Sequence, residues 1–158
     1  MKKLIVVAIV SGSIGFVLGN AFWYLASPLW IDIEVAEEIS TADTAKILTT
    51  GTFTDADGAH KGRGTATIYE GSDGRKTLRL SDFEVTNGPD LKVWLVAKPG
   101  IASASDVTES KWHSLGRLKG NIGDQNYDIP ADVDLSKYKS VVIWCEQFSV
   151  LFSPATLN

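Results

Sequence analysis

The feature that most constrains this chain is an uncharged, apolar stretch that runs from Leu4 to Ile31. A helix needs about 20 predominantly apolar residues to cross the hydrocarbon core of a bilayer, so this stretch is long enough. Pro28 is predicted to end the helix. Amphipathic aromatic residues, which favour the headgroup region, gather near its far end: Trp23, Tyr24 and Trp30. We therefore expect residues 1–31 to form a transmembrane signal-anchor.

Charges on either side of this stretch predict its orientation. Lys2 and Lys3 precede it, whereas acidic residues follow from Asp32 onward. The positive-inside rule then places the N-terminus in the cytoplasm and exports the remainder. We expect a single-pass protein of the inner (plasma) membrane with a periplasmic or extracellular domain. Membrane lipid is the partner expected for the helix.

A cleaved signal peptide is the competing interpretation. Gly19-Asn20-Ala21 places small residues at the two positions that a signal peptidase requires. A signal-peptide core spans about 7–15 residues and then stops, whereas this apolar run continues beyond Ala21. The length favours an uncleaved anchor, and both interpretations place the domain outside the cytoplasm.

The pattern changes after the apolar stretch. Residues 32–46 are acidic and rich in Ala, Ser and Thr, which indicates a juxtamembrane spacer with room for a short helix. Residues 47–158 contain short β-rich runs separated by turn residues, which is typical of a sandwich. The runs are Ile47–Phe53, Thr65–Tyr69, Thr77–Leu80, Leu91–Ala97, Trp112–Leu118, a weaker run ending at Ile129, Ser140–Phe148 and Val150–Phe152. The prediction is a mainly β chain: an antiparallel β-sandwich of about eight strands behind one transmembrane helix.

Composition narrows the function classes. The net charge of −4 argues against a nucleic-acid partner, because phosphate binding needs a basic face. The chain lacks the G-x-S-x-G, H-E-x-x-H, P-loop and C-x-x-C patterns, which favours a non-enzymatic role. Asp55 and Asp57 resemble the start of a calcium loop, but no glutamate follows at the twelfth position, so we predict a solvated turn.

Three residues stand out as soft or borderline metal ligands: His60, His113 and Cys145. Two imidazoles and one thiolate have the donor types for a copper, zinc or haem-iron site, provided that the fold brings them together. The plainer alternative is two histidines in turns or on the surface and a cysteine that packs as a small apolar residue. Strand alternation predicts that Cys145 faces the core, which favours an inert thiol unless His60 or a metal lies beside it.

Tryptophans recur along the predicted strands. We interpret Trp94, Trp112 and Trp144 as core aromatics, whereas exposed ones would indicate a binding surface. Gly88-Pro89-Asp90 is interpreted as a turn that defines the fold.

An ordered set of motifs runs from about Thr50 to the C-terminus. They are Gly51-Thr52-Phe53; His60 followed by Gly64-Thr65-Ala66; Leu78-Arg79-Leu80-Ser81-Asp82-Phe83; Asn87-Gly88-Pro89-Asp90-Leu91-Lys92-Val93-Trp94-Leu95; Leu115-Gly116; Leu118-Lys119-Gly120-Asn121; Gln125-Asn126-Tyr127; Val142-Ile143-Trp144-Cys145-Glu146-Gln147-Phe148-Ser149-Val150-Leu151-Phe152; and Ala155-Thr156-Leu157. With this set the chain resembles the DM13 family, an electron-transfer domain related to DOMON domains.

The resemblance implies a β-sandwich with a redox role centred on Cys145, which acts directly or ligates a haem or metal such as copper. His60 matches a histidine frequently found after the first strand, whereas His113 lies on no matching motif. Two functions remain open: a membrane-anchored redox module with an unidentified redox partner, and a non-catalytic ligand-binding or adhesion module with a structural cysteine. The approach of His60 or another ligand to the Cys145 sulfur would separate them.

Overall fold

The computed structural model describes residues 1–27, 30–41, 43–44 and 46–158. Its elements, in chain order, are α1 (Lys2–Ala26), β1 (Glu34–Ala36), β2 (Lys46–Thr52), β3 (Gly62–Glu70), β4 (Lys76–Val85), β5 (Leu91–Val96), α2 (Ala104–Thr108), β6 (Trp112–Arg117), β7 (Ile122–Ile129), the short 3-10 helix η2 (Leu135–Lys137), β8 (Ser140–Cys145) and β9 (Val150–Thr156). The helix predicted from the apolar stretch and the eight predicted strands are all present.

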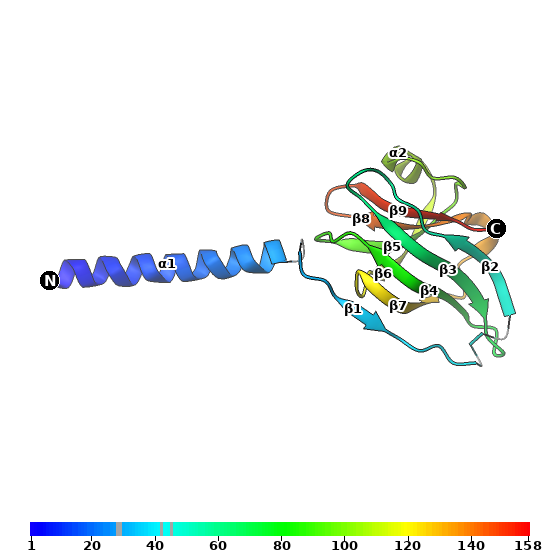
Figure 1. Ribbon diagram of the computed structural model, residues 1–158, viewed down its shortest axis with the longest axis horizontal. Helices are drawn as coiled ribbons and strands as arrows, with labels where there is room; N and C mark the ends of the chain where they lie inside the picture. The colour runs from blue at the N-terminus through cyan, green and yellow to red at the C-terminus, as the bar shows by residue number, and fades with distance from the viewer. Residues whose placement is uncertain (28–29, 42, 45) are drawn as a thin grey trace.

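Helix α1 projects away from the rest of the chain, and its residues from Lys2 to Tyr24 are all exposed (Figure 1). Among the described residues, the segment Lys2–Tyr24 is the one helix long and apolar enough to cross a membrane. An anchor and a signal sequence share these properties. Pro28, predicted to end the helix, lies outside the described residues.

Two sheets form the sandwich that follows α1 (Figure 1). The five-stranded sheet has the order β1-β7-β4-β3-β2, and the four-stranded sheet has the order β6-β5-β8-β9. The predicted mainly β sandwich is thereby confirmed. The chain passes from the first sheet to the second through the turn at 86–90, where β4 ends and β5 begins.

Strand β1 lies in the segment predicted to be a spacer. It pairs with β7 in parallel, with Glu34 opposite Ile122 and Ala36 opposite Asp124, whereas the other strand pairs are antiparallel. Three residues are too short to display an alternating pattern, and their partner strand is far away in the sequence. Local sequence pattern therefore does not predict this strand.

Buried side chains form two clusters on opposite faces of the four-stranded sheet. The larger cluster lies between the sheets and includes Val141, Ile143 and Cys145. The smaller cluster includes Val142 and Trp144 and is covered by the 97–111 segment that contains α2. Strand β5 contributes to both clusters, as its continuous apolar run predicts. The expected alternation along β8, with Cys145 facing the main core, is confirmed.

The β2 and β9 edges meet and close one side of the sandwich. Thr50 and Asn158 exchange backbone hydrogen bonds, and Phe53 forms an isolated bridge with Ala155. Gly51 allows this approach, because a Cβ there would lie 2.4 Å from the Thr156 carbonyl oxygen.

Candidate functional site

Cys145 is the last residue of β8, and its side chain is sealed from solvent. It is 1% exposed, lies opposite Leu91 on β5 and Val150 on β9, and belongs to the main apolar cluster. Apolar surroundings favour a neutral thiol over a thiolate. The thiol is thus built into the core, as strand alternation predicted.

Cys145 lies at the end of the sandwich from which the chain leads back to α1. The Glu146 backbone N–H, directly after the thiol, donates to the Asp90 carbonyl in the 86–90 turn. Asn87 in that turn donates to Asp32, which precedes β1. The thiol, the 86–90 turn and the connection to α1 therefore share one end of the domain.

Gly88 brings the 86–90 turn onto this part of the core. A Cβ at Gly88 would lie 2.8 Å both from Leu91 Cδ2 and from Phe152 Cζ. Leu91 is the strand partner of Cys145, and Phe152 belongs to the same buried cluster. The predicted turn thus defines the fold and also covers the neighbours of the thiol.

His60 reaches the same cluster through one aromatic ring. Its imidazole lies against the Phe152 ring, with a centroid separation of 4.4 Å, and its Nδ1 donates to Asp57 Oδ2 at 2.8 Å. The hydrogen bond from the His60 side chain, with those from the backbone N–H groups of His60 and Ala59, lowers the pKa of Asp57 to about 2. A carboxylate that fixes one imidazole nitrogen leaves Nε2 as the acceptor, an arrangement common in metal-binding histidines.

His113 lies towards the other end of the sandwich. It is on β6 opposite Leu95, and its ring meets Tyr138 edge-on at 6.5 Å. Cys145 is opposite Leu91, four residues earlier along β5, which corresponds to roughly 13 Å of strand. The register therefore does not bring His113 to the thiol.

The positions of Cys145, His60 and His113 decide whether these side chains could together bind the haem or copper that the resemblance implies. Among the described residues, no group of three or more His, Cys, Asp and Glu side chains is arranged to hold a metal ion. One His60 ring nitrogen is fixed by Asp57, as in many metal-binding histidines, but the ring contacts the cluster that contains Cys145 through Phe152. The described donors therefore form no three-ligand metal site as arranged, and ligation of a haem or copper by Cys145, His60 and His113 stays a prediction.

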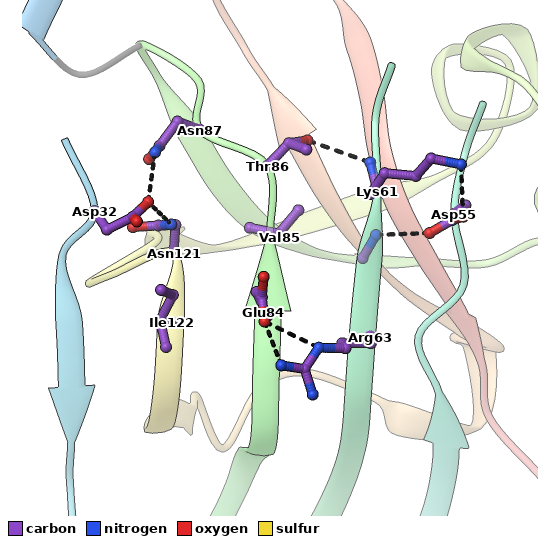
Figure 2. A pocket seen from close by; sticks show the side chains of 11 residues that line it. Asp32, Asp55, Lys61, Arg63, Glu84, Val85, Thr86, Asn87, Asn121 and Ile122 are labelled. Atoms are coloured by element: carbon purple, nitrogen blue, oxygen red, sulfur yellow. Dashed lines mark hydrogen bonds and ion pairs between the residues drawn. The ribbon is translucent and has the colours of Figure 1, made fainter. Parts of the chain in front are cut away.

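A cavity of about 440 Å³ lies beside this end of the sandwich, over the ends of β3, β4 and β7 (Figure 2). Four of its charged side chains form two ion pairs: Lys61 with Asp55 at 2.9 Å, and Arg63 with Glu84. The hydrogen bond from Lys61 lowers the pKa of Asp55. The fifth, Asp32, accepts hydrogen bonds from the side-chain amides of Asn87 and Asn121. Cys145 does not line this cavity.

Three tryptophans on the outer face of the four-stranded sheet form a stack that the sequence did not predict. Trp94 lies 4.0 Å from Trp112 and 5.4 Å from Trp144, measured between ring centroids. Both contacts are diagonal across neighbouring strands, since Trp112 is opposite Val96 and Trp144 is opposite Lys92. The expectation of core aromatics holds for Trp94 and Trp144, whereas Trp112 is 47% exposed.

Fold and site together define a two-sheet β-sandwich that follows an apolar helix and encloses one thiol at the helix-connected end. A family model described as "Electron transfer DM13" matches residues 52–157. The chain therefore belongs to the DM13 family, as the motifs indicated. Searches of curated proteins and of solved structures returned no match.

Proposed function

We propose that this protein is a membrane-anchored, extracytoplasmic electron-transfer domain in which Cys145 is the redox group. The observation that carries the proposal is the match of residues 52–157 to the Electron transfer DM13 family, a segment that contains the only cysteine of the chain. One-electron oxidation of a thiol releases one electron and one proton to a partner and the surroundings. His60, held by Asp57, contacts the cluster that contains the thiol through the Phe152 ring.

The position of Cys145 supports a partner at the membrane. The thiol lies at the helix-connected end of the sandwich, and α1 has the length and composition of a membrane span. Lys2 and Lys3 support a cytoplasmic N-terminus and an exported domain. In this arrangement the buried thiol lies at the membrane-proximal end of the sandwich.

The burial of Cys145 favours a second candidate function, a ligand-binding or adhesion module with a structural cysteine. A side chain that is 1% exposed within an apolar cluster is typical of a cysteine that only packs. The two functions differ in what the thiol does.

The test uses the full chain, purified in detergent from a membrane fraction. Wild type, Cys145→Ser and Val141→Ser are compared in a redox titration with soluble mediators, together with metal content and the absorbance spectrum. Val141→Ser is the matched control, because it places the same hydroxyl in the same cluster on the same strand. The proposal expects a redox transition that Cys145→Ser abolishes and that Val141→Ser retains.

An identical transition in all three proteins, or none in wild type, would favour the structural cysteine. Metal or haem lost only from Cys145→Ser would identify the thiol as a ligand.

A further inference from the structure

The stacked tryptophans connect solvent with the strand that carries the thiol. Trp112, at the start of β6, is 47% exposed, whereas Trp94 and Trp144 are 4% and 2% exposed. The order along the stack is Trp112, Trp94, Trp144, and the residue after Trp144 is Cys145. The stack thus begins at a solvent-exposed ring and ends at the residue that precedes Cys145 on β8.

Ring geometry suits electron transfer between these indoles. Trp112 and Trp94 are nearly parallel, with planes 9° apart, and Trp94 and Trp144 are 29° apart. Electron tunnelling falls steeply with distance, so two ring-to-ring steps with centroids 4.0 and 5.4 Å apart are fast relative to a single long step. Neighbouring residues on a strand point to opposite faces, so Trp144 and Cys145 are separated by the β8 backbone itself.

The middle of the stack is chemically unusual. Among the described residues, the Trp94 Nε1–H is a buried polar group without a hydrogen-bond partner. Without an acceptor, an oxidised Trp94 has no base to take its proton, so the positive charge stays on the indole and can move on.

We propose that Trp112, Trp94 and Trp144 form an electron relay between a one-electron oxidant docked at Trp112 and the β8 strand beside Cys145. The oxidant takes one electron from Trp112 and is itself reduced by one electron. One electron then passes from Trp94 to Trp112, and one from Trp144 to Trp94, so the oxidised site ends at Trp144. No bond forms or breaks in these steps. Because indoles are hard to oxidise, the partner belongs to the class of strong one-electron oxidants. The biological purpose of this relay rests on the proposed function, since Cys145 is the redox group that it would serve.

The test generates tris(bipyridine)ruthenium(III) by a light flash in the presence of the full chain in detergent, with a cobalt(III) ammine as the final acceptor. Oxygenated indole products are then mapped by peptide mass spectrometry. The bulky complex cannot contact Trp144 directly, so products at Trp144 report the relay. Circular dichroism confirms the fold of each variant.

Wild type and Cys145→Ser are the starting proteins, and Trp112→Phe is introduced into both. We expect products at Trp144 in Cys145→Ser and their loss with Trp112→Phe. Trp30→Phe is the matched control, because Trp30 is 51% exposed but lies outside the stack, and it should leave the Trp144 products unchanged. Trp94→Phe should interrupt the relay in the same way as Trp112→Phe.

Two results would overturn the relay: no Trp144 products in either starting protein, or products that survive Trp112→Phe at the original level. Comparison of the starting proteins tests the thiol separately. A higher yield at Trp144 in Cys145→Ser than in wild type means that the thiol normally refills Trp144. Equal yields would leave the relay intact and would count against a redox role for Cys145.

Discussion

The His60 imidazole lies against the Phe152 ring at 4.4 Å, with the ring planes inclined by 57°. Phe152 is 5% exposed and belongs to the cluster that holds Cys145, so a half-exposed loop residue rests directly on the core beside the thiol. The His60 imidazole therefore contacts the apolar cluster that contains Cys145 through the ring of Phe152.

Replacement of Phe152 tests the importance of this ring for the fold. Phe152→Ala removes a buried aromatic side chain and should lower the free energy of unfolding by about 3–5 kcal/mol. Phe148→Ala is the control, since Phe148 is 62% exposed in the neighbouring turn and should change stability by less than about 0.5 kcal/mol. Denaturant unfolding measures both. Equal losses would mean that Phe152 is not a core residue.

The His60–Asp57 hydrogen bond predicts a specific titration. Asp57 has a pKa of about 2 in the folded chain against its ordinary 3.8, so the carboxylate stabilises the fold above the ordinary value and this contribution is lost as pH falls through about 2. His60→Leu should raise the pKa of Asp57 towards 3.8, because the largest cause of the shift is the His60 side chain. Carboxyl chemical shifts followed by NMR check this prediction. An Asp57 titration that is the same in both proteins would contradict the hydrogen bond.

A buried polar network fixes the loop that leads into β7. The Tyr127 hydroxyl donates to Gln125 Oε1 at 2.8 Å and accepts from the Lys119 backbone N–H at 3.1 Å, and burial raises the pKa of Tyr127. Tyr127→Phe should cost about 1 kcal/mol of unfolding free energy, since two hydrogen bonds disappear from a buried site. Tyr69→Phe, at a less buried hydroxyl, is the matched control and should cost less. An unchanged free energy of unfolding in Tyr127→Phe would show that the network does not stabilise the fold.

Strand β1 predicts where the domain can be shortened. A chain that begins at Asp32 keeps β1, the Asp32 hydrogen bond from Asn121 and the Glu37–Lys119 ion pair at 2.8 Å. A chain that begins at Ser40 loses them all and exposes the β7 edge, so its melting temperature should be several degrees lower. Thermal melts of the two fragments provide the measurement. Identical melting temperatures would mean that β1 adds nothing to the sandwich.

Membrane attachment is tested on cell fractions. An uncleaved anchor predicts that the protein keeps residues 1–31 in its intact mass and stays with membranes after an alkaline carbonate wash. The exported orientation predicts that protease added to spheroplasts removes the domain. Recovery of a soluble chain that begins shortly after Ala21 would instead establish a cleaved signal peptide.

The sequence predicted the elements and faces that depend on local pattern. The alternation along β8 predicted the core-facing Cys145, and the burial of β5 on both faces agrees with its continuous apolar run. Asp73-Gly74 lies in the β3–β4 turn, where Gly74 adopts a φ of +80°, as the local turn chemistry of an Asp-Gly pair favours. These signals arise from neighbouring residues, so they can be read without the tertiary structure.

Relationships between distant strands could not be predicted. The separation of His113 from Cys145 follows from the pairing of β5 with both β6 and β8, which no local pattern specifies. The tryptophan stack depends on the same registers, because a one-residue slip would turn Trp94 or Trp144 to the opposite face. Strand β1 was missed since its partner lies at Ile122–Asp124, far along the chain.

The early position of β1 also limits how far the domain can travel. Helix α1 ends at Ala26 and β1 begins at Glu34, so the connecting chain can extend over roughly 25–30 Å at most. With the proposed uncleaved anchor, the β1 end of the sandwich therefore stays within this distance of the end of the helix. A partner of the proposed electron transfer then has to approach the domain close to the membrane.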